Sequence, residues 1–265
     1  MLNIVVCVKA VPDPKDEHKI YIDPKTKNLV RGDISLVLNS LDKHAIEAAL
    51  QLKAQQGAHI TVLSMGPPAA GNIIKECLAL GADRGVLLSD REFAGADAYA
   101  TAYTLARGIE KLGTYDIVLC GTASSDSGTE WVGPEVAVLL GIPVVTMVQE
   151  IVKIDTQQFT VKSDWENGYR LVRTQLPAVL TITRDLNTPR TLSFSGIIKA
   201  RKKEIEQWAL ADMQIDAHTI GIKGSPTIVS DMEVLESRRE VEIIEGEREE
   251  KAERLIQKLA ESGVV

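Results

Sequence analysis

A run of small and hydroxyl-bearing residues stands between two apolar segments near the middle of the chain. It reads Gly121-Thr-Ala-Ser-Ser-Asp-Ser-Gly-Thr129, and it follows the apolar run Asp116–Cys120. In such a strand-to-helix loop, backbone N–H groups and Ser or Thr hydroxyls can surround a phosphate. An ordinary loop rich in helix-capping residues has the same composition, so the stretch alone supports both interpretations. It is neither a Walker loop, because no Gly-Lys-Ser/Thr follows, nor a GxGxxG fingerprint.

The cluster Ser124, Ser125 and Asp126 also suggests a small-molecule hydrolase with a serine nucleophile. Such a nucleophile needs a base and an oxyanion hole, and the sequence reveals no base. The four histidines have neither a nucleophile-elbow context nor a metal-ligand spacing. We interpret His44, near a helix start, and His59, before a strand, as surface residues. We therefore expect no catalytic residue and no metal site.

A second polar group, Asn39-Ser-Leu-Asp42, stands just before the first long helical pattern. Asn39 or Ser40 is a suitable helix N-cap, and Asp42 carries the charge that the positive end of a helix favours. Capping alone explains these residues. A binding role requires that the neighbouring strand ends face the same ligand.

The elements that would position these groups alternate in the first half of the chain. Short apolar runs alternate with longer helical patterns, which is typical of βαβ units and a parallel sheet. The ends of the strands near Cys7, Met65 and Gly121 should meet at one edge, where open α/β sheets bind ligands. A small hairpin is expected around Ile20 to Val30. The expected strands are Ile4–Val8, Ile60–Met65, Gly85–Leu88 and Asp116–Cys120, and the expected helices are Leu41–Ala54, Ile73–Leu80 and Ala96–Leu112.

After Ile142 four strand-like runs follow without intervening helices, which predicts an antiparallel extension of the sheet. They are Val144–Val152, Gln158–Lys162, Tyr169–Thr174 and Ala178–Thr183. We divide the chain into an α/β domain at 1–206 and a C-terminal arm at 207–265, which ends in a charged helix from about Glu245 to Leu259. The arm is either a flexible appendage or a segment buried on another chain; we favour the second because of its apolar residues. These are Trp208, Leu210, Met213, Ile215, Ile220 and Ile222.

The composition indicates a folded protein with 45% hydrophobic and 25% charged residues. A net charge of −7 argues against broad binding of nucleic acid or of an anionic membrane. The three cysteines have no paired spacing, which fits a reducing cytoplasm. We find no signal-peptide pattern and no apolar run of about 20 residues, so we expect neither export nor membrane insertion.

Several stretches together resemble the electron-transfer flavoprotein β family in order and spacing, over roughly positions 3 to 206. Each is weak alone, but the combination of LPAVLT, NTPR and IIKARKK is specific. The stretches are VKAVPDP at 8 to 14, NSLDKHAIEAAL at 39 to 50, MGPP at 65 to 68, LALGADRGVLL at 78 to 88, VLCGTASSDSGTEWVGP at 118 to 134, ENGY, RTQLPAVLTITRDLNTPR at 173 to 190, and SGIIKARKKEI at 195 to 205.

The resemblance implies an open, mostly parallel, Rossmann-like sheet with helices on both faces and a nucleotide in this chain. Backbone near the strand ends would hold the adenosine part, and the hydroxyl-rich loop with the next helix would hold phosphate. The matching positions are Cys7, Asn39, Ser40, Leu41, Asp42, Met65, Gly121, Thr122, Ala123, Ser124, Ser125, Asp126, Ser127, Gly128, Thr129, Glu130, Trp131 and Val132.

The family has two versions. One keeps a structural AMP in this pocket and transfers single electrons through an FAD housed mainly by an α subunit. The other binds a second FAD here, receives hydride from NADH and bifurcates its two electrons. The stretch Asp126-Ser-Gly-Thr-Glu-Trp-Val-Gly-Pro134 is more similar to the bifurcating pattern. Trp131, where Gln is common, and the loop start Thr-Ala-Ser-Ser depart from it.

The resemblance also implies partners. The β subunit packs against an α subunit, and the segment at about 184–203 contacts a flavin-dependent dehydrogenase, of acyl-CoA type or another flavoenzyme; ferredoxin is a further acceptor through the complex. Phe194 occupies the position of the apolar anchor, although it also suits a loop residue covering its own helix. The expected partner-binding residues are Leu192, Phe194, Ile197, Lys199, Arg201 and Lys202.

One alternative belongs to another class. An ATP-binding module similar to universal stress proteins also uses a Gly/Ser phosphate loop after a late strand. Such a module is shorter and does not explain LPAVLT, NTPR or the basic run at Lys199 to Lys203.

Overall fold

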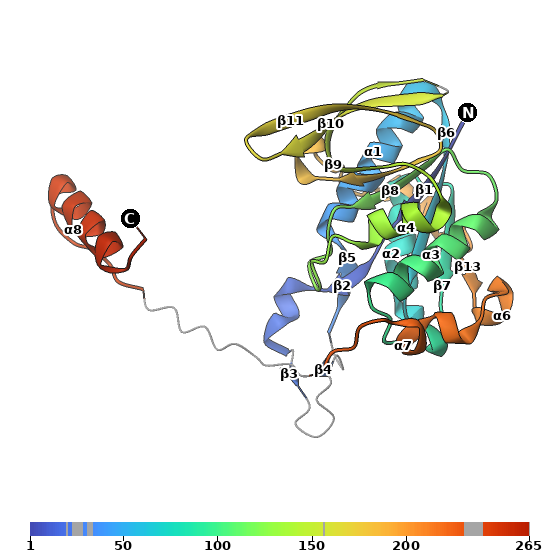
Figure 1. Ribbon diagram of the computed structural model, residues 1–265, viewed down its shortest axis with the longest axis horizontal. Coiled ribbons are helices and arrows are strands. Elements are labelled where there is room, and N and C mark those ends of the chain that lie inside the picture. The colour runs from blue at the N-terminus through green and yellow to red at the C-terminus, as the bar shows by residue number, and fades with distance from the viewer. Residues whose placement is uncertain (20, 23–28, 31–33, 156, 231–240, 265) are drawn as a thin grey trace.

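The described residues form a nine-stranded sheet with helices on both faces, which confirms the predicted α/β class (Figure 1). The computed structural model describes all residues except 20, 23–28, 31–33, 156, 231–240 and 265. The strand order is β11-β10-β9-β12-β8-β1-β6-β7-β13. These strands are β1 (Leu2–Cys7), β6 (Ala58–Met65), β7 (Arg84–Leu88), β8 (Ile117–Gly121), β9 (Val144–Ile154), β10 (Gln158–Trp165), β11 (Gly168–Gln175), β12 (Ala178–Ile182) and β13 (Glu206–Trp208).

The central strands are apolar on both sides because a layer of helices covers each face. Alternate residues of β1 enter different cores: Ile4 and Val6 belong to one cluster, Val5 and Cys7 to the other. Helices α1 (Ser40–Gln56) and α2 (Gly71–Leu80) cover the first cluster, and α3 (Ala98–Leu112) and α4 (Val132–Leu140) cover the second. A strand buried on both faces reads as a continuous apolar run, which is why these strands were predictable.

The predicted antiparallel extension is partly wrong. Strand β10 pairs antiparallel with both β9 and β11, as predicted, whereas β12 lies between β8 and β9 and is parallel to both. The hairpin β10–β11 supplies the connection that brings the chain back into the parallel sheet. The order of strands depends on long-range pairing, which the local pattern of residues 144 to 183 does not encode.

Short elements connect β1 to α1. Strand β2 (Ala10–Pro12) pairs with β5 (Leu36–Leu38), and β3 (Tyr21–Ile22) pairs with β4 (Leu29–Val30). The antiparallel pairing of β3 with β4 confirms the small hairpin; residues 23–28, which connect the two strands, lie outside the described residues.

The expectation that the apolar residues at 208 to 222 are buried on another chain is largely wrong. Strand β13 pairs with β7, and Met213 and Ile220 are buried in the chain's own second core. Trp208, Leu210 and Ile215 pack partly buried against that core, and only Ile222 is well exposed. Because β13 pairs with β7, this segment packs on the chain's own core. The local periodicity of the segment did not indicate that pairing. The short helices α6 (Leu210–Met213) and α7 (Gly221–Gly224) belong to this segment.

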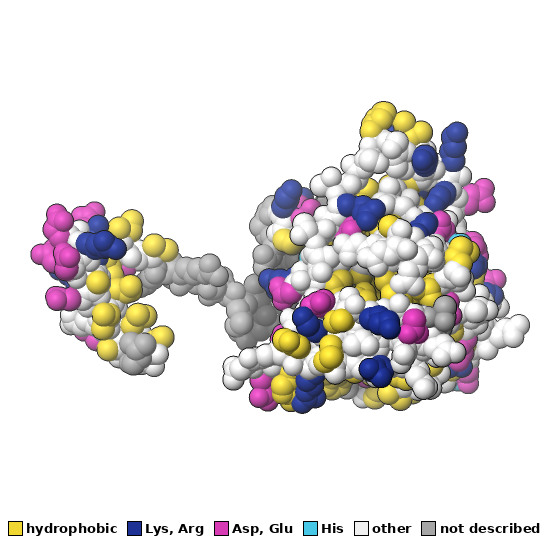
Figure 2. Space-filling model, turned by 90° about the horizontal axis from the view of Figure 1, so that it is seen from above, with side chains coloured by type: hydrophobic (Ala, Val, Ile, Leu, Met, Phe, Trp, Pro, Cys, Tyr) yellow, Lys and Arg dark blue, Asp and Glu magenta, His cyan; other side chains and the backbone are white. Residues whose placement is uncertain are grey.

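Two further helices lie outside the parallel βα pattern. Helix α5 (Phe194–Arg201) packs on α2, and α8 (Arg248–Glu261) lies apart from the sheet in Figure 1. Figure 2 shows hydrophobic side chains along one side of α8. Leu255 and Ile256 of this helix are exposed. Within the described residues, no helix has both the length and the hydropathy needed to cross a bilayer.

Candidate functional site

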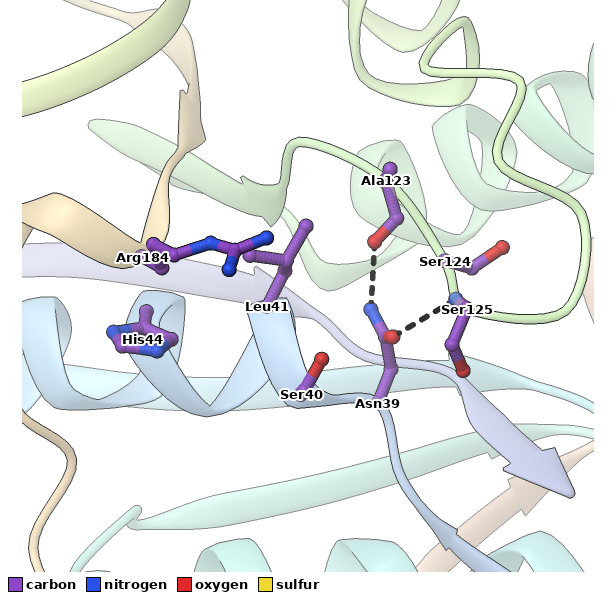
Figure 3. Close-up of a pocket in the computed structure, with 8 residues that line it drawn as sticks. All are labelled: Asn39, Ser40, Leu41, His44, Ala123, Ser124, Ser125 and Arg184. Atoms are coloured by element: carbon purple, nitrogen blue, oxygen red, sulfur yellow. Dashed lines mark hydrogen bonds between the residues drawn. The ribbon is translucent and has the colours of Figure 1, made fainter. Parts of the chain in front are cut away.

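A pocket of about 390 Å³ lies between the first turn of α1 and the loop that follows β8 (Figure 3). Its size is within the range typical of small-molecule sites. The pocket forms at the carboxyl edge of the parallel sheet, where a ligand site was predicted. Its lining residues are Asn39, Ser40, Leu41, His44, Ala123, Ser124, Ser125 and Arg184.

Asp42 fixes one wall of the site by joining three elements. Its Oδ2 accepts a hydrogen bond from the backbone N–H of Lys9 at 2.7 Å, and its Oδ1 accepts one from that of Gly121 at 3.2 Å. These bonds tie the first turn of α1 to the ends of β1 and β8. Burial, opposed by the two N–H donors, raises the pKa of Asp42 to about 7. Asp42 is thus a buried cross-link beneath the pocket as well as a residue of the helix start.

Asn39 connects α1 to the loop rather than capping the helix. It occupies the N-cap position of α1 but makes no side-chain capping bond. Its Nδ2 donates to the carbonyl oxygen of Ala123 at 2.8 Å, and its Oδ1 accepts from the N–H of Ser125 at 3.2 Å. The capping interpretation is therefore wrong for the side chain of Asn39. Both hydrogen-bonding groups of the buried amide are used to shape the loop.

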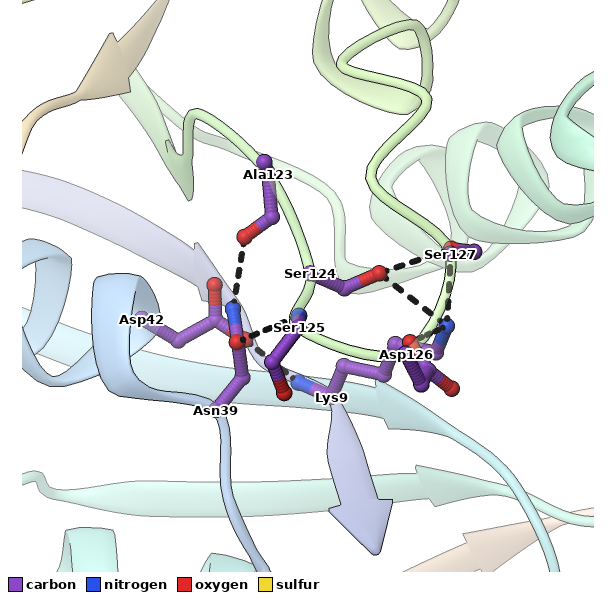
Figure 4. A network of polar contacts seen from close by, with 8 residues as sticks. All are labelled: Lys9, Asn39, Asp42, Ala123, Ser124, Ser125, Asp126 and Ser127. Carbon is purple, nitrogen blue, oxygen red and sulfur yellow. Dashed lines mark hydrogen bonds and ion pairs between the residues drawn. The ribbon is translucent and has the colours of Figure 1, made fainter. Parts of the chain in front are cut away.

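Lys9 brings a positive charge to the hydroxyl cluster of the loop (Figure 4). Its Nζ lies 2.6 Å from Asp126 Oδ1, 3.3 Å from Ser124 Oγ and 3.4 Å from Ser127 Oγ. Burial opposes ionisation of Asp126, but the hydrogen bond and charge of Lys9 outweigh it and lower the pKa of that carboxyl. An ammonium group beside serine hydroxyls is the donor set that a phosphate requires.

The loop itself turns back on residue 124. The N–H of Gly128 donates to the carbonyl oxygen of Ser124 at 2.9 Å, and Gly128 has a φ of 61°. Helix α4 begins four residues later, at Val132, so its free N–H groups follow the hydroxyl cluster directly. This arrangement is compatible with anion binding.

The structure brings most of the predicted binding residues together, but not all of them. Ser40, Leu41 and Ala123 to Ser125 line the pocket. Cys7 and Met65 belong to the second core, and Thr122 donates to Thr181. Residues 126 to 132 lie in the loop and the start of α4 without lining this pocket, and the nucleotide-binding role of the whole set stays a prediction.

Three residues of the site were not predicted. Lys9 follows β1 closely in sequence, and its position two residues after Cys7 was a usable signal. His44 lies one turn of α1 after Ser40, so it lines the pocket and is not a simple surface residue. His59 lies within β6 rather than before it. Arg184 follows β12, so its position at the pocket could not be predicted without knowing where β12 lies in the sheet.

The geometry gives no support to a serine nucleophile. Ser124 Oγ lies 3.3 Å from Lys9 Nζ and 2.8 Å from Ser127 Oγ, and it also hydrogen-bonds to the Asp126 carboxylate. Lys9 Nζ is ion-paired with Asp126 and lowers the pKa of that carboxyl, which makes Asp126 a weak base for Ser124. Among the described residues, no group of His, Cys, Asp and Glu is arranged to hold a metal ion.

The predicted partner-binding residues surround an exposed helix. Phe194 is 80% exposed, and Leu192 and Ile197 are exposed beside it. Lys199, Arg201 and Lys202 are also exposed, whereas Lys203 donates to the carbonyl oxygen of Ala82. The structure leaves these apolar and basic side chains accessible for contact with another molecule.

By its fold and pocket, the protein is a doubly wound α/β protein with a polar pocket at the carboxyl edge of its sheet. Residues 26–213 match the family described as "Electron transfer flavoprotein domain". The chain therefore belongs to the electron-transfer flavoprotein family, and its relatives place it among the β subunits.

Three relatives illustrate the match. The chain is 44% identical to an electron transfer flavoprotein subunit beta of Clostridium acetobutylicum over 98% of both chains. It is 42% identical to the caffeyl-CoA reductase-Etf complex subunit CarD of Acetobacterium woodii over 86% of both. It is 36% identical to the acryloyl-CoA reductase electron transfer subunit gamma of Anaerotignum propionicum over the full length of both. This agreement over the whole chain disfavours the universal-stress alternative.

Proposed function

We propose that this β subunit works with an α subunit to carry electrons between NADH or a dehydrogenase and other acceptors, with a nucleotide cofactor held in the pocket beside α1. The main support for the proposal is that Lys9 Nζ lies within hydrogen-bonding distance of the hydroxyls of Ser124 and Ser127 at the edge of that pocket. A bound flavin would supply the electron chemistry, and the protein would position it and set its potential.

The residues present fit a nucleotide. Lys9, Ser124, Ser127 and the first turn of α4 would bind phosphate, because they offer a cation, hydroxyls and backbone N–H groups close together. Asn39 would hold the loop in the shape that presents these donors. None of these residues has to exchange a proton with the substrate for this role.

We propose FAD rather than AMP as the nucleotide, and electron bifurcation with NADH as donor. Support comes from the stretch between Asp126 and Pro134, and from relatives named as parts of a caffeyl-CoA reductase-Etf complex and of an acryloyl-CoA reductase. The test is denaturing extraction of the purified αβ heterodimer. Two FAD per heterodimer and no AMP would support the proposal, whereas one FAD with AMP would identify the non-bifurcating type.

The binding site itself is tested by Asp126→Ala and Thr129→Ala. Both should reduce nucleotide retention and leave the fold intact, since each lies in the exposed loop after β8. Asp155→Ala is a matched control, because Asp155 is a half-buried carboxylate outside this loop that accepts hydrogen bonds from the N–H groups of Gln157 and Gln158. Unchanged nucleotide content in the two loop variants would argue against this site.

The partner is proposed to be a flavin-dependent dehydrogenase or reductase, with ferredoxin as a further acceptor through the complex. Phe194 on α5 would be the central aromatic contact, and the basic residues beside it would attract an acidic surface. The exposed apolar side of α8, with the C-terminal segment before it, would pack on the α subunit. We propose that the assembly works in the cytoplasm.

A further inference from the structure

Residues 184–190, which we call the strap, connect the end of β12 to the approach to α5 and lie along α1. Two side chains of the strap, Asn187 and Arg190, contact α1 residues that are 143 positions earlier in the sequence. Contacts this distant in sequence hold the strap to the body of the domain, although the strap has little regular structure of its own.

The stronger contact is the pair between Arg190 and Glu47. Arg190 Nε lies 2.7 Å from Glu47 Oε2, Nη2 lies 2.9 Å from Oε1, and the backbone N–H of Arg190 donates to Oε2 at 3.2 Å. The Glu47 side chain is 7% exposed and that of Arg190 is 45% exposed. A two-point ion pair with an additional backbone bond fixes direction as well as distance.

The second contact is reciprocal. His44 Nδ1 lies 3.0 Å from the carbonyl oxygen of Asn187 and 3.1 Å from its Oδ1, while Asn187 Nδ2 donates to the carbonyl oxygen of His44 at 3.0 Å. Both atoms facing Nδ1 are acceptors, so Nδ1 carries a hydrogen and Nε2 stays available to another group.

The same turn of α1 lines the nucleotide pocket. His44 is a lining residue, and so is Arg184, the first residue of the strap; both stand beside Leu41 in Figure 3. Within the described part of the chain Arg184 has no ion-pair partner. A nucleotide in the pocket would therefore touch the strap at Arg184 and the residue that holds the strap at His44.

Helix α5 is also anchored on α2, both in its first turn and just beyond its last residue. A Cβ on Gly196 would lie 2.3 Å from the carbonyl oxygen of Ala79, so α5 packs directly on the end of α2. Lys75 Nζ also donates to the carbonyl oxygen of Lys203, just beyond α5, at 2.9 Å. The strap leads directly into the first turn of α5, which begins with Phe194, so the position of Phe194 depends on the strap as well as on the contact at Gly196.

We propose that Arg190 is a positioning residue that fixes the first turn of α5 through the strap, and that a nucleotide in the pocket strengthens this hold through Arg184 and His44. The inference rests on the proposed nucleotide pocket and on the docking role of Phe194. Its consequence is that loading of the cofactor and presentation of the docking helix are coupled within this one chain.

Hydrogen exchange of the full-length chain, read by mass spectrometry, tests the inference with AMP and FAD as probes. In the wild type, saturating nucleotide should slow exchange of the amides at 187–196. Arg190→Gln should raise exchange there about tenfold without nucleotide, because one charge-assisted pair is lost. It should also abolish the slowing, although calorimetry still detects nucleotide binding.

Further variants separate positioning from misfolding. Glu47→Gln should reproduce Arg190→Gln, and Arg190→Lys should restore part of the protection because it keeps the charge but loses the two-point geometry. Arg91→Gln, which changes an exposed arginine between β7 and α3, is the matched control and should have no effect on 187–196.

Equal slowing by nucleotide in the wild type and in Arg190→Gln would overturn the coupling. Unchanged exchange in nucleotide-free Arg190→Gln would overturn the positioning role. If neither AMP nor FAD binds the wild type, the proposed pocket and the nucleotide half of the inference both fail. The comparison of nucleotide-free variants still decides the role of Arg190.

Discussion

Replacement of Gly121 by alanine probes the close approach between the end of β8 and the first turn of α1. Gly121 ends β8 directly beneath the first turn of α1. An added Cβ would lie 2.3 Å from Asp42 Oδ1 and 2.9 Å from both the backbone nitrogen of Asp42 and the carbonyl carbon of Leu41. Two of these atoms belong to the backbone, so rotation of a side chain cannot remove the clash. The strand and the helix must move apart.

The expected cost follows from these contacts. Overpacking typically destabilises by about 1–3 kcal/mol. Displacement of Asp42 also weakens its bond with the Gly121 N–H, and loss of a buried hydrogen bond costs about 1 kcal/mol. We expect Gly121→Ala to lower the free energy of unfolding by about 3 kcal/mol. For a chain of this size, that corresponds to a melting temperature lower by roughly 6–12 °C.

Thermal unfolding followed by circular dichroism, with nucleotide content after denaturing extraction, measures both consequences. Gly168→Ala is the matched control, because a Cβ at Gly168 meets nothing within 4 Å. It should leave melting temperature and nucleotide content unchanged. If Gly121→Ala melts within about 2 °C of the wild type and keeps its nucleotide, the close approach does not constrain this site, and the reasoning is refuted.

Three further predictions concern charge and exposure. Because burial raises the pKa of Asp42 from 3.8 to about 7, the folded state binds more protons than the unfolded state between these values. This group's contribution to the unfolding free energy therefore falls as pH rises from about 4 to 7, by up to about 4 kcal/mol. Subtracting the urea-unfolding profile of Asp42→Asn from that of the wild type should reveal this slope, whereas parallel profiles would contradict it. Lys9→Gln should weaken AMP binding about 10- to 100-fold in calorimetry. Its free energy of unfolding should change by less than about 1 kcal/mol, because the ion pair of Lys9 with Asp126 is partly exposed. Unchanged AMP affinity would show that Lys9 is not part of the phosphate site. Phe194→Ala should raise KM for the acceptor dehydrogenase at least about tenfold and leave the nucleotide content unchanged. Val138→Ala, which also replaces an exposed apolar residue, should leave this KM unchanged. Equal KM values for Phe194→Ala and the wild type would exclude Phe194 as the docking contact.

Local pattern was sufficient for most elements of the fold. The buried strands β1, β6 and β8 are short apolar runs, and α1 carries its buried residues at helical spacing before Gly57 ends it. The position of the candidate site followed from the same pattern, since parallel strands end at one edge. The pattern failed for β12 and β13, whose places in the sheet depend on which distant strands they pair with.

The sequence by itself determined the class of fold, the hydroxyl-rich loop after β8 and the group at 39 to 42, because each depends on residues that are neighbours along the chain. Only the tertiary structure decided that Lys9 reaches Asp126, that Asp42 lies buried between two strand ends, and that Arg190 holds the strap to Glu47. These contacts join residues between 33 and 143 positions apart. Packing of the two helical layers on the sheet sets such distances, and no local propensity specifies them.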